Sequence, residues 1–353
     1  MPWRFVAPSP YGIRAITQTQ GKLAITSEGP TLLGKTVRFV AGMAIGAGLL
    51  YLTLRDVSWQ DIESELAHIA YGWILFALVT YWCELALRIV RWRVLLAGLQ
   101  PPVAGDKVTM AFLSGYAVNN VLPAKLGEPF RADLLGRLGG VSRLSAFGSI
   151  IVERMFDMLM VLGMTAWGVL MVSSLHADTL ADVNRGLVAL FLPVLVAAAG
   201  LYFLATRKEN VLVVKLKSMS EKLSNLIVGL EVPEGASSYV KLVSTTLVIW
   251  LLNSIAMWCI LRGLDVHLGV GQTIMLIGLT GISAAIPAAP AGIGTLQYAF
   301  YLAAVLFDFA PSAAVVAAAI VQIVLLGSAT LLGAAAYSRA LSRYLLKPAG
   351  ATQ

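Results

Sequence analysis

Long apolar runs alternate with short polar connectors along most of this chain of 353 residues. Six of the runs hold about 19 to 26 residues, enough for a helix that crosses ~30 Å of hydrocarbon. They lie near residues 36–54, 72–90, 147–172, 186–205, 242–262 and 312–336. This pattern predicts an all-α fold, a polytopic helical bundle in a membrane.

Two further apolar regions, residues 108–139 and 272–308, are interrupted in the middle by proline and glycine. Each arm holds roughly 15 residues, or ~22 Å of helix, which is short for a span but suits one arm of a re-entrant hairpin. Two proline-kinked helices in a bundle are the plainer interpretation. We expect hairpins, with breaks at Pro123 and Gly127 in the first region and at Pro287, Pro290, Gly292 and Gly294 in the second.

The basic residues favour the hairpin interpretation. Suppose that the N-terminus is cytoplasmic, that the six runs span, and that both broken regions return to the side they left. Then 19 Lys and Arg residues fall on the cytoplasmic side and three, Arg55, Arg185 and Arg262, fall outside. This asymmetry follows the positive-inside rule. We therefore predict a multi-pass protein of a bacterial inner membrane, with both termini in the cytoplasm.

The layout repeats with opposite orientation. One span precedes each broken region and another follows it, so residues 72–172 and 242–336 form two similar halves. The first hairpin enters from the cytoplasm and the second from outside, which is the inverted repeat common in transporters. We expect one transmembrane domain at 36–338, a mobile cytoplasmic tail at 1–35 and a second cytoplasmic tail at 339–353.

Composition excludes several classes of protein. Hydrophobic residues make up 58% of the chain and charged residues 13%, against ~25% charged in soluble domains. The net charge of +7 comes from residues between apolar runs, without a basic stripe, so we expect no nucleic acid partner. Two cysteines, both inside apolar runs, and three scattered histidines indicate no disulfide, metal site or cofactor.

The richest polar segment surrounds the first break. It contains Asn119, Asn120, Lys125, Glu128 and Arg131 within an apolar region. Because a helix that begins at Glu128 offers free amide N–H groups, a lipid phosphate is a plausible ligand for that end, with Lys125 and Arg131 beside it. A cytoplasmic loop with a solvated Glu128–Arg131 pair is the alternative.

Charges also lie inside two spans. Glu153, Arg154 and Asp157 occupy the span at 147–172, where charges are costly and usually line a cavity or pair internally. Glu84, Arg88 and Arg91 share one face of the span at 72–90 as secondary candidates. For these arginines, snorkelling to the cytoplasmic interface is the plainer interpretation. The second break carries no charge, and Gln297 is its nearest polar side chain. We expect its exposed backbone to pack closely against the first hairpin.

These motifs resemble the transmembrane family named after lysylphosphatidylglycerol synthase, also called flippase-like membrane proteins. The matching pieces are Asn119, Leu122-Pro123, Gly127-Glu128 and Arg131, then Glu153-Arg154 and Asp157, then Pro287, Pro290, Gly292 and Gly294. The chain departs from the family pattern at Ala291, where members often have glycine, and at residues 295–297, where many carry an acidic residue.

The resemblance implies that the protein handles a lipid or lipid-linked headgroup, as a flippase-like or hopanoid-associated member. It does not imply lysyl transfer, because that activity belongs to a separate soluble domain. We expect a translocase that binds anionic, polyprenyl or hopanoid-type lipids. A non-transporting partner that presents lipid to a membrane enzyme is the first alternative. A membrane-embedded transferase that uses Glu128, Glu153 or Asp157 as base is the second and weaker one.

Overall fold

A computed structural model describes residues 32–122, 125–172, 210–233, 235–285 and 290–346, with single positions between 193 and 200. Within these ranges the chain is helical and contains no strand, which confirms the predicted helical fold class. Two predicted break residues, Pro123 and Pro287, lie outside the described residues. The predicted run at 186–205 lies outside them too, apart from the single positions between 193 and 200. The helices are α1 (Leu32–Leu54), α2 (Trp59–Ala67), α3 (Tyr71–Leu96), α4 (Gly105–Val121), α5 (Gly127–Gly139), α6 (Arg143–Met171), α8 (Val211–Met219), α9 (Glu221–Leu230), α10 (Ala236–Gly263), α11 (Val270–Ala285), the short η1 (Pro290–Gly292), α12 (Thr295–Phe307), α13 (Pro311–Ile320), the π-helical η2 (Val321–Leu326), α14 (Gly327–Ala340) and η3 (Leu341–Leu345).

Four helical segments of the described chain are long and apolar enough to cross a membrane, or five if α1 and α2, bent by 81°, count as one span. They are α3, α10, η1 with α12, and the continuous segment from α13 to η3. The helix α6 covers the predicted run at 147–172 and carries Glu153, Arg154 and Asp157 within it. How these charges are neutralised is therefore a central question about the fold.

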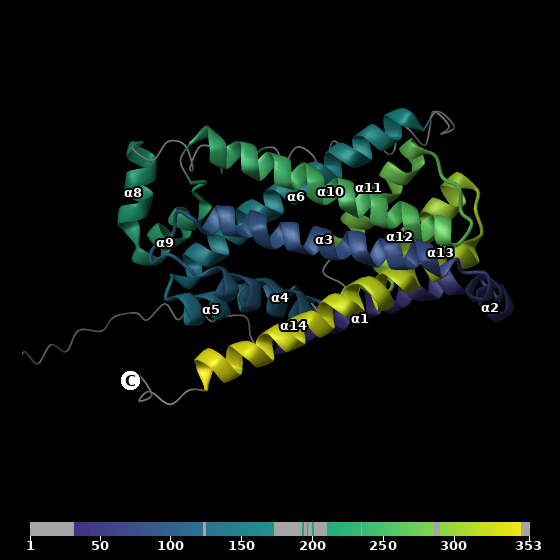
Figure 1. Cartoon of the computed structure of the whole chain (residues 1–353), viewed down its shortest axis with the longest axis horizontal. Helices are drawn as coiled ribbons and strands as arrows, with labels where there is room; N and C mark the ends of the chain where they lie inside the picture. Colours follow the sequence, from purple (N-terminus) through teal and green to yellow (C-terminus); the bar gives the residue numbers. More distant parts are fainter. Residues whose placement is uncertain are drawn as a thin grey trace, which may run out of the picture.

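Helices α3 and α10 form an antiparallel pair along the length of the bundle (Figure 1). The amide of Ala70 donates to the Gly263 carbonyl over 2.9 Å at one end of the pair. At the other end the Pro233 ring lies beside Gly98. The two helices therefore face each other along their whole length.

The first broken region folds back on itself as a helical hairpin. Helices α4 and α5 pack together, and a side chain at Gly127 would overlap the Gly115 carbonyl, so glycine permits this close approach. At the base of the hairpin Val103 lies against Gly139, and α5 ends at Gly140 with φ of 72°, a conformation that favours glycine. The region thus begins and finishes at the same end of the bundle.

The second broken region also forms two packed arms, α11 and α12. At its tip Gly294 has φ of 87°, and a side chain there would overlap the backbone of Gly46 in α1. The short η1 contacts α4 of the first hairpin. The expected packing between the hairpins is therefore present, but α1 is the partner that touches Gly294.

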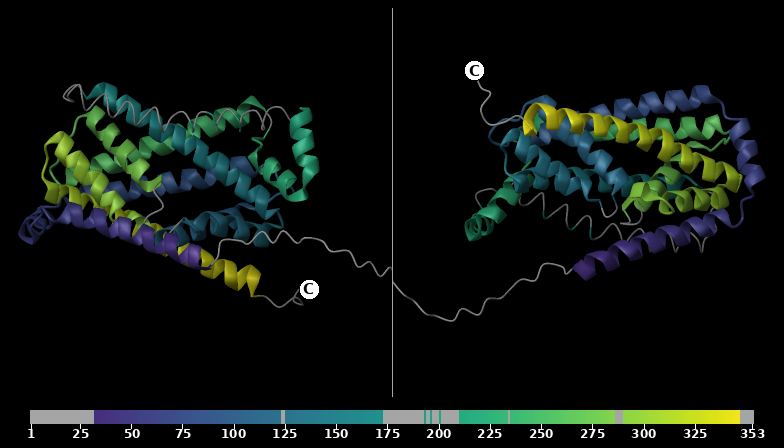
Figure 2. Two further views of the ribbon diagram at one scale, coloured as in Figure 1. Left: turned by 180° about the vertical axis from the view of Figure 1, so that it is seen from behind. Right: turned by 90° about the horizontal axis from the view of Figure 1, so that it is seen from below.

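Each hairpin packs its first arm against the last helix of the other half (Figure 2). Helix α4 lies along α14, where Gly333 approaches Leu113 and Ala117. Helix α11 lies along α6, where Gly278 approaches Thr165. Small residues at these crossings bring the helix backbones close, as in other membrane helix pairs.

The last helix continues past residue 338 to Leu345. Its end is attached to the base of the first hairpin. The Tyr344 hydroxyl donates to Asp106 over 2.8 Å, and Lys107 lies 5.2 Å from the Tyr344 ring centre. The hydrogen bond from Tyr344 holds the pKa of Asp106 below its ordinary value.

Candidate functional site

Charged side chains from three helices meet inside the bundle and form what we call the charge network. Helix α3 supplies one face with the spacing i, i+4, i+7, α6 supplies a second face, and α5 of the first hairpin supplies the third. Its members are Glu84, Arg88, Arg91, Glu128, Arg131, Glu153, Arg154 and Asp157. Acidic and basic members are equal in number, so the network is formally neutral.

Arg91 and Asp157 form a buried bidentate pair. The guanidinium donates to both Asp157 oxygens over 2.8 and 3.1 Å and lies 3.4 Å from Glu153, and the Arg91 side chain has no exposed surface. A bidentate contact of this kind is strong because the planar fork matches the carboxylate. Snorkelling of Arg88 and Arg91 is therefore wrong: both point into the bundle, where α6 supplies their counter-ion.

Arg131 is buried rather than presented at the hairpin tip. It donates to Glu153 over 2.8 Å, and its guanidinium lies 4.3 Å from the Trp92 ring centre and 4.9 Å from that of Phe112. Each aromatic contact stabilises the cation by ~0.5–2 kcal/mol. In this conformation Arg131 is a structural member of the network and has no access to a phosphate.

Helix α10 adds polar residues that the sequence analysis missed. Thr246 accepts from Arg91 over 3.2 Å, Trp250 donates to Asp157 over 3.3 Å, and Asn253 donates to Glu84 over 3.2 Å. These three residues have the same spacing, i, i+4, i+7, as the charges on α3. That spacing in an apolar run was the signal that could have identified them.

Arg88 links the two sides of the network. Its guanidinium donates to Glu84 over 2.8 Å within α3 and to Asp157 on α6 over 3.3 Å. Because Glu84 also accepts from Asn253, three helices share this part of the network. Removing one member would therefore leave a partner unpaired on another helix.

The network becomes accessible at what we call the open edge, formed by Lys125, Glu128 and Arg154. Arg154 has 35% of its side-chain surface exposed and Glu128 20%, against none for Arg91 and Glu153. Arg154 Nε lies 2.9 Å from Glu128 Oε1, yet this N–H forms no hydrogen bond within the described residues. Glu128 thus pairs with Arg154 and not with Arg131. Lys125 is exposed and within electrostatic range of both partners.

The predicted amide candidates hold the hairpin tips together. Asn119 accepts from the Gly127 amide over 2.7 Å, and Asn120 donates to the Leu326 carbonyl over 3.1 Å and to Thr330 over 3.0 Å. Gln297 accepts from the Gly294 amide over 2.8 Å and donates to Gln322 over 2.7 Å. These groups satisfy backbone and side-chain polar atoms where the helices are broken.

The chemistry available to this site is ion-pair exchange. Within the described residues every carboxylate of the network has an arginine within 4.0 Å, the limit for an ion pair, so each is a counter-ion and not a free base. No group of histidine, cysteine or acidic residues in the described part of the chain has the arrangement of a metal site. An anion that reaches the open edge would compete with Glu128 for Arg154.

Comparison with known proteins places this architecture among membrane proteins of related sequence. Residues 39–333 match the family profile described as the lysylphosphatidylglycerol synthase transmembrane region. A UPF0104 membrane protein of Methanothermobacter thermautotrophicus is 30% identical over 117 residues, which cover 33% of this chain and 35% of that protein. A second UPF0104 membrane protein, from Methanocaldococcus jannaschii, is 23% identical over 185 residues, covering 52% of this chain and 76% of that protein.

The glycosyltransferase AglD of Haloferax volcanii is 24% identical over 327 residues, covering 80% of this chain and 51% of AglD. The chain thus spans about a third to a half of two of these relatives. The family profile covers the chain from within α1 to α14, including both hairpins and the charge network. The chain is therefore a membrane protein that belongs to the family of the lysylphosphatidylglycerol synthase transmembrane region.

Proposed function

We propose that this protein translocates a phospholipid or lipid-linked headgroup across a bacterial inner membrane. The observation that carries the proposal is the charge network, which is neutral, buried and accessible at one edge. Charges inside a membrane protein are costly and usually line a path for a polar substrate. The headgroup would enter at the open edge while its tails stay in lipid.

An exchange of ion-pair partners at Arg154 supplies a physical route for the headgroup. Arg154 is held by Glu128 at 2.9 Å but by Asp157 and Glu153 only at 3.5 and 3.8 Å. A lipid phosphate at the open edge would replace Glu128 as the partner of Arg154, with Lys125 nearby. The deeper pairs would stay intact, and the released Glu128, which is 20% exposed, would keep Lys125 as its neighbouring cation.

An alternating-access mechanism with re-entrant hairpins in an inverted repeat belongs to this proposal. It is supported by the reciprocal packing of α4 on α14 and of α11 on α6, in which the two halves exchange equivalent contacts. It is also supported by the return of residues 108–139 to the end where they began. In such a repeat the hairpins rock against the opposite half and open the site to each side in turn.

The test is lipid translocation in proteoliposomes. Fluorescent phosphatidylglycerol or phosphatidylethanolamine in the inner leaflet is followed by a reductant that quenches only the outer leaflet. A hydrogen bond to a charged group is worth ~1.5–3 kcal/mol, so Arg154→Ala should slow translocation roughly tenfold or more. Arg154→Lys should restore part of the rate, because it keeps charge without the planar fork.

The matched control is Arg339→Ala, which removes an exposed arginine from α14 and should leave the rate unchanged. Both variants must elute as folded protein in detergent. Wild-type rates from folded Arg154→Ala would remove the open edge from the mechanism. The absence of translocation by the wild type with every lipid class would reject the translocase itself.

The second candidate is a partner that presents lipid to an enzyme without moving it across the membrane. It is favoured by the similarity to a protein named as a glycosyltransferase, of which this chain matches about half. Lipid bound to the purified protein, with no translocation and with a glycan or lipid enzyme recovered alongside it, would support this candidate. Catalysis by the chain is the weakest proposal, because the carboxylates that would act as base are paired with arginines.

A further inference from the structure

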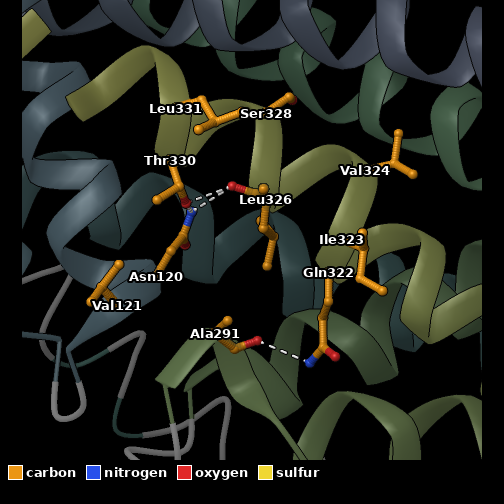
Figure 3. A pocket seen from close by; sticks show the side chains of 11 residues that line it. Asn120, Val121, Ala291, Gln322, Ile323, Val324, Leu326, Ser328, Thr330 and Leu331 are labelled. Atoms are coloured by element: carbon orange, nitrogen blue, oxygen red, sulfur yellow. Dashed lines mark hydrogen bonds between the residues drawn. The ribbon is translucent and has the colours of Figure 1, made fainter. Parts of the chain in front are cut away.

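A groove of about 570 Å³ lies where the tips of the two hairpins approach the last helix (Figure 3). The end of α4, the short η1, the π-helical η2 and the start of α14 form its walls. Its volume is within the ~300–1,000 Å³ of pockets that hold small molecules. The groove is separate from the charge network, none of whose members lines it.

The lining has the chemistry of a hydrocarbon site. It contains no charged side chain, and its largest exposed surfaces belong to Ile323 and Leu331, at 75% and 74%. The polar groups point at one another: Asn120 donates to the Leu326 carbonyl and to Thr330, and Gln322 donates to the Ala291 carbonyl over 3.2 Å. With these partners in place, the groove offers an occupant mainly apolar contact.

A π-helical turn and a glycine lie beside this space. In η2 the chain winds as a π-helix, a local irregularity that is frequent at functional sites. Gly327 is the next residue after η2 and lines the groove, and a Cβ placed there would meet one backbone oxygen at 3.7 Å, an ordinary contact. A Cβ would therefore fit at position 327 without overlap, so the packing of the helices does not require glycine there.

The groove and the open edge share the tip of the first hairpin. Asn120 lines the groove, its neighbour Asn119 accepts from the Gly127 amide, and the next residue, Glu128, pairs with Arg154. An apolar site and an anion site thus lie on adjoining residues of one hairpin. A phospholipid has this combination of chemistry in a single molecule.

We propose that the groove binds one fatty acyl chain of a phospholipid whose headgroup occupies the open edge. The position of the headgroup rests on the proposed function, whereas the acyl chain in the groove can be tested without any transport. The apolar side chains at its rim face lipid in a chain of mean hydropathy +0.80, so an acyl chain has direct access. The groove would select the lipid by its acyl chain, and the charge network would bind the headgroup.

The experiment uses the full chain in phosphatidylethanolamine vesicles that contain phosphatidylglycerol with a diazirine at the end of one acyl chain. After irradiation and digestion, mass spectrometry maps the labelled residues. We expect labels concentrated at Val121 and in residues 322–331. Gly327→Leu, which fills the groove, should reduce this labelling severalfold. Gly163→Leu is the matched control on α6, since open space surrounds Gly163 too and it does not line the groove.

Equal labelling of wild type and Gly327→Leu would overturn the proposal, as would labels spread evenly over the lipid-facing helices. Stronger labelling by a polyprenyl phosphate with the same diazirine would overturn the choice of an acyl chain. Should the leucine variant fail to fold, Gly327→Ala adds a smaller group to the same space and should reduce labelling by a lesser amount. Specific labelling in a protein that moves no lipid would reject the translocase and keep the acyl-chain site, so the two failures are distinguishable.

Discussion

At the scale of single residues, burial separates members of the charge network that otherwise look alike. Arg91 and Arg131 have almost no exposed side-chain surface, and each is fixed by a carboxylate on α6. Arg154 is adjacent in the network but partly exposed, with a single short contact. The first two arginines therefore stabilise the fold, whereas Arg154 is placed to exchange partners.

A double-mutant cycle tests this division. Arg131→Met alone leaves Glu153 short of a partner, and Glu153→Gln alone leaves the Arg131 cation unpaired, so each should lower stability by ~3–5 kcal/mol. The double variant removes both charges, and we expect it to be more stable than the sum of the single losses by ~0.5–3 kcal/mol. Thermal unfolding in detergent, followed by size-exclusion chromatography, measures all four proteins. Strictly additive losses would show that the pair is not coupled.

At the scale of elements, the hairpins depend on glycines at points of close backbone approach. Gly127 lets α5 approach α4, and Gly294 lets the second tip lie on Gly46 of α1. The two positions differ in conformation, because Gly294 also has φ of 87°. That value is strained for any residue with a side chain.

Gly294→Ala should therefore destabilise the protein by two effects, overlap with the Gly46 backbone and an unfavourable φ. We expect a loss of ~2–4 kcal/mol, since overpacking alone costs ~1–3 kcal/mol. Gly48→Ala is the matched control. Gly48 lies on α1, the helix that Gly294 contacts, and a methyl group at Gly48 would meet open space. Heat stability of the two variants in detergent should differ clearly. An unchanged Gly294→Ala would mean that α1 does not hold the second hairpin in this position.

At the scale of the whole molecule, the two ends of the bundle differ in the charged residues that they carry. The end that holds the base of the first hairpin carries Arg93, Lys107, Arg137 and Arg143. The other end, near α2, carries Asp56, Asp61 and Glu65. Such a polarity orients a membrane protein with its basic end in the cytoplasm.

Cysteine labelling tests this orientation and the hairpin together. In a variant that lacks Cys83 and Cys259, single cysteines at Gly105, Ser142, Ser218 and Ser342 should react from the cytoplasmic side. A cysteine at Glu63 in α2 should react from outside. Opposite accessibility of positions 105 and 142 would mean that residues 108–139 cross the membrane, and the inverted repeat would be wrong.

The sequence by itself determined the class of protein and the parts of the site. Long apolar runs require lipid as solvent, and the proline and glycine breaks mark where helices end, because both effects act locally along the chain. Charged residues inside apolar runs are costly, so they mark a candidate functional region. For this reason the eight charged members of the network were all among the predicted residues.

Only the tertiary structure decided which charges pair and which stay accessible. Glu128 and Arg131 are neighbours on one helix, yet they pair with different residues of α6, Glu128 with Arg154 and Arg131 with Glu153. The same holds for the polar face of α10 and for the groove at Gly327, which exist only where helices far apart in sequence meet. Pairing inside a bundle depends on packing between helices, and a single sequence carries no direct record of that packing.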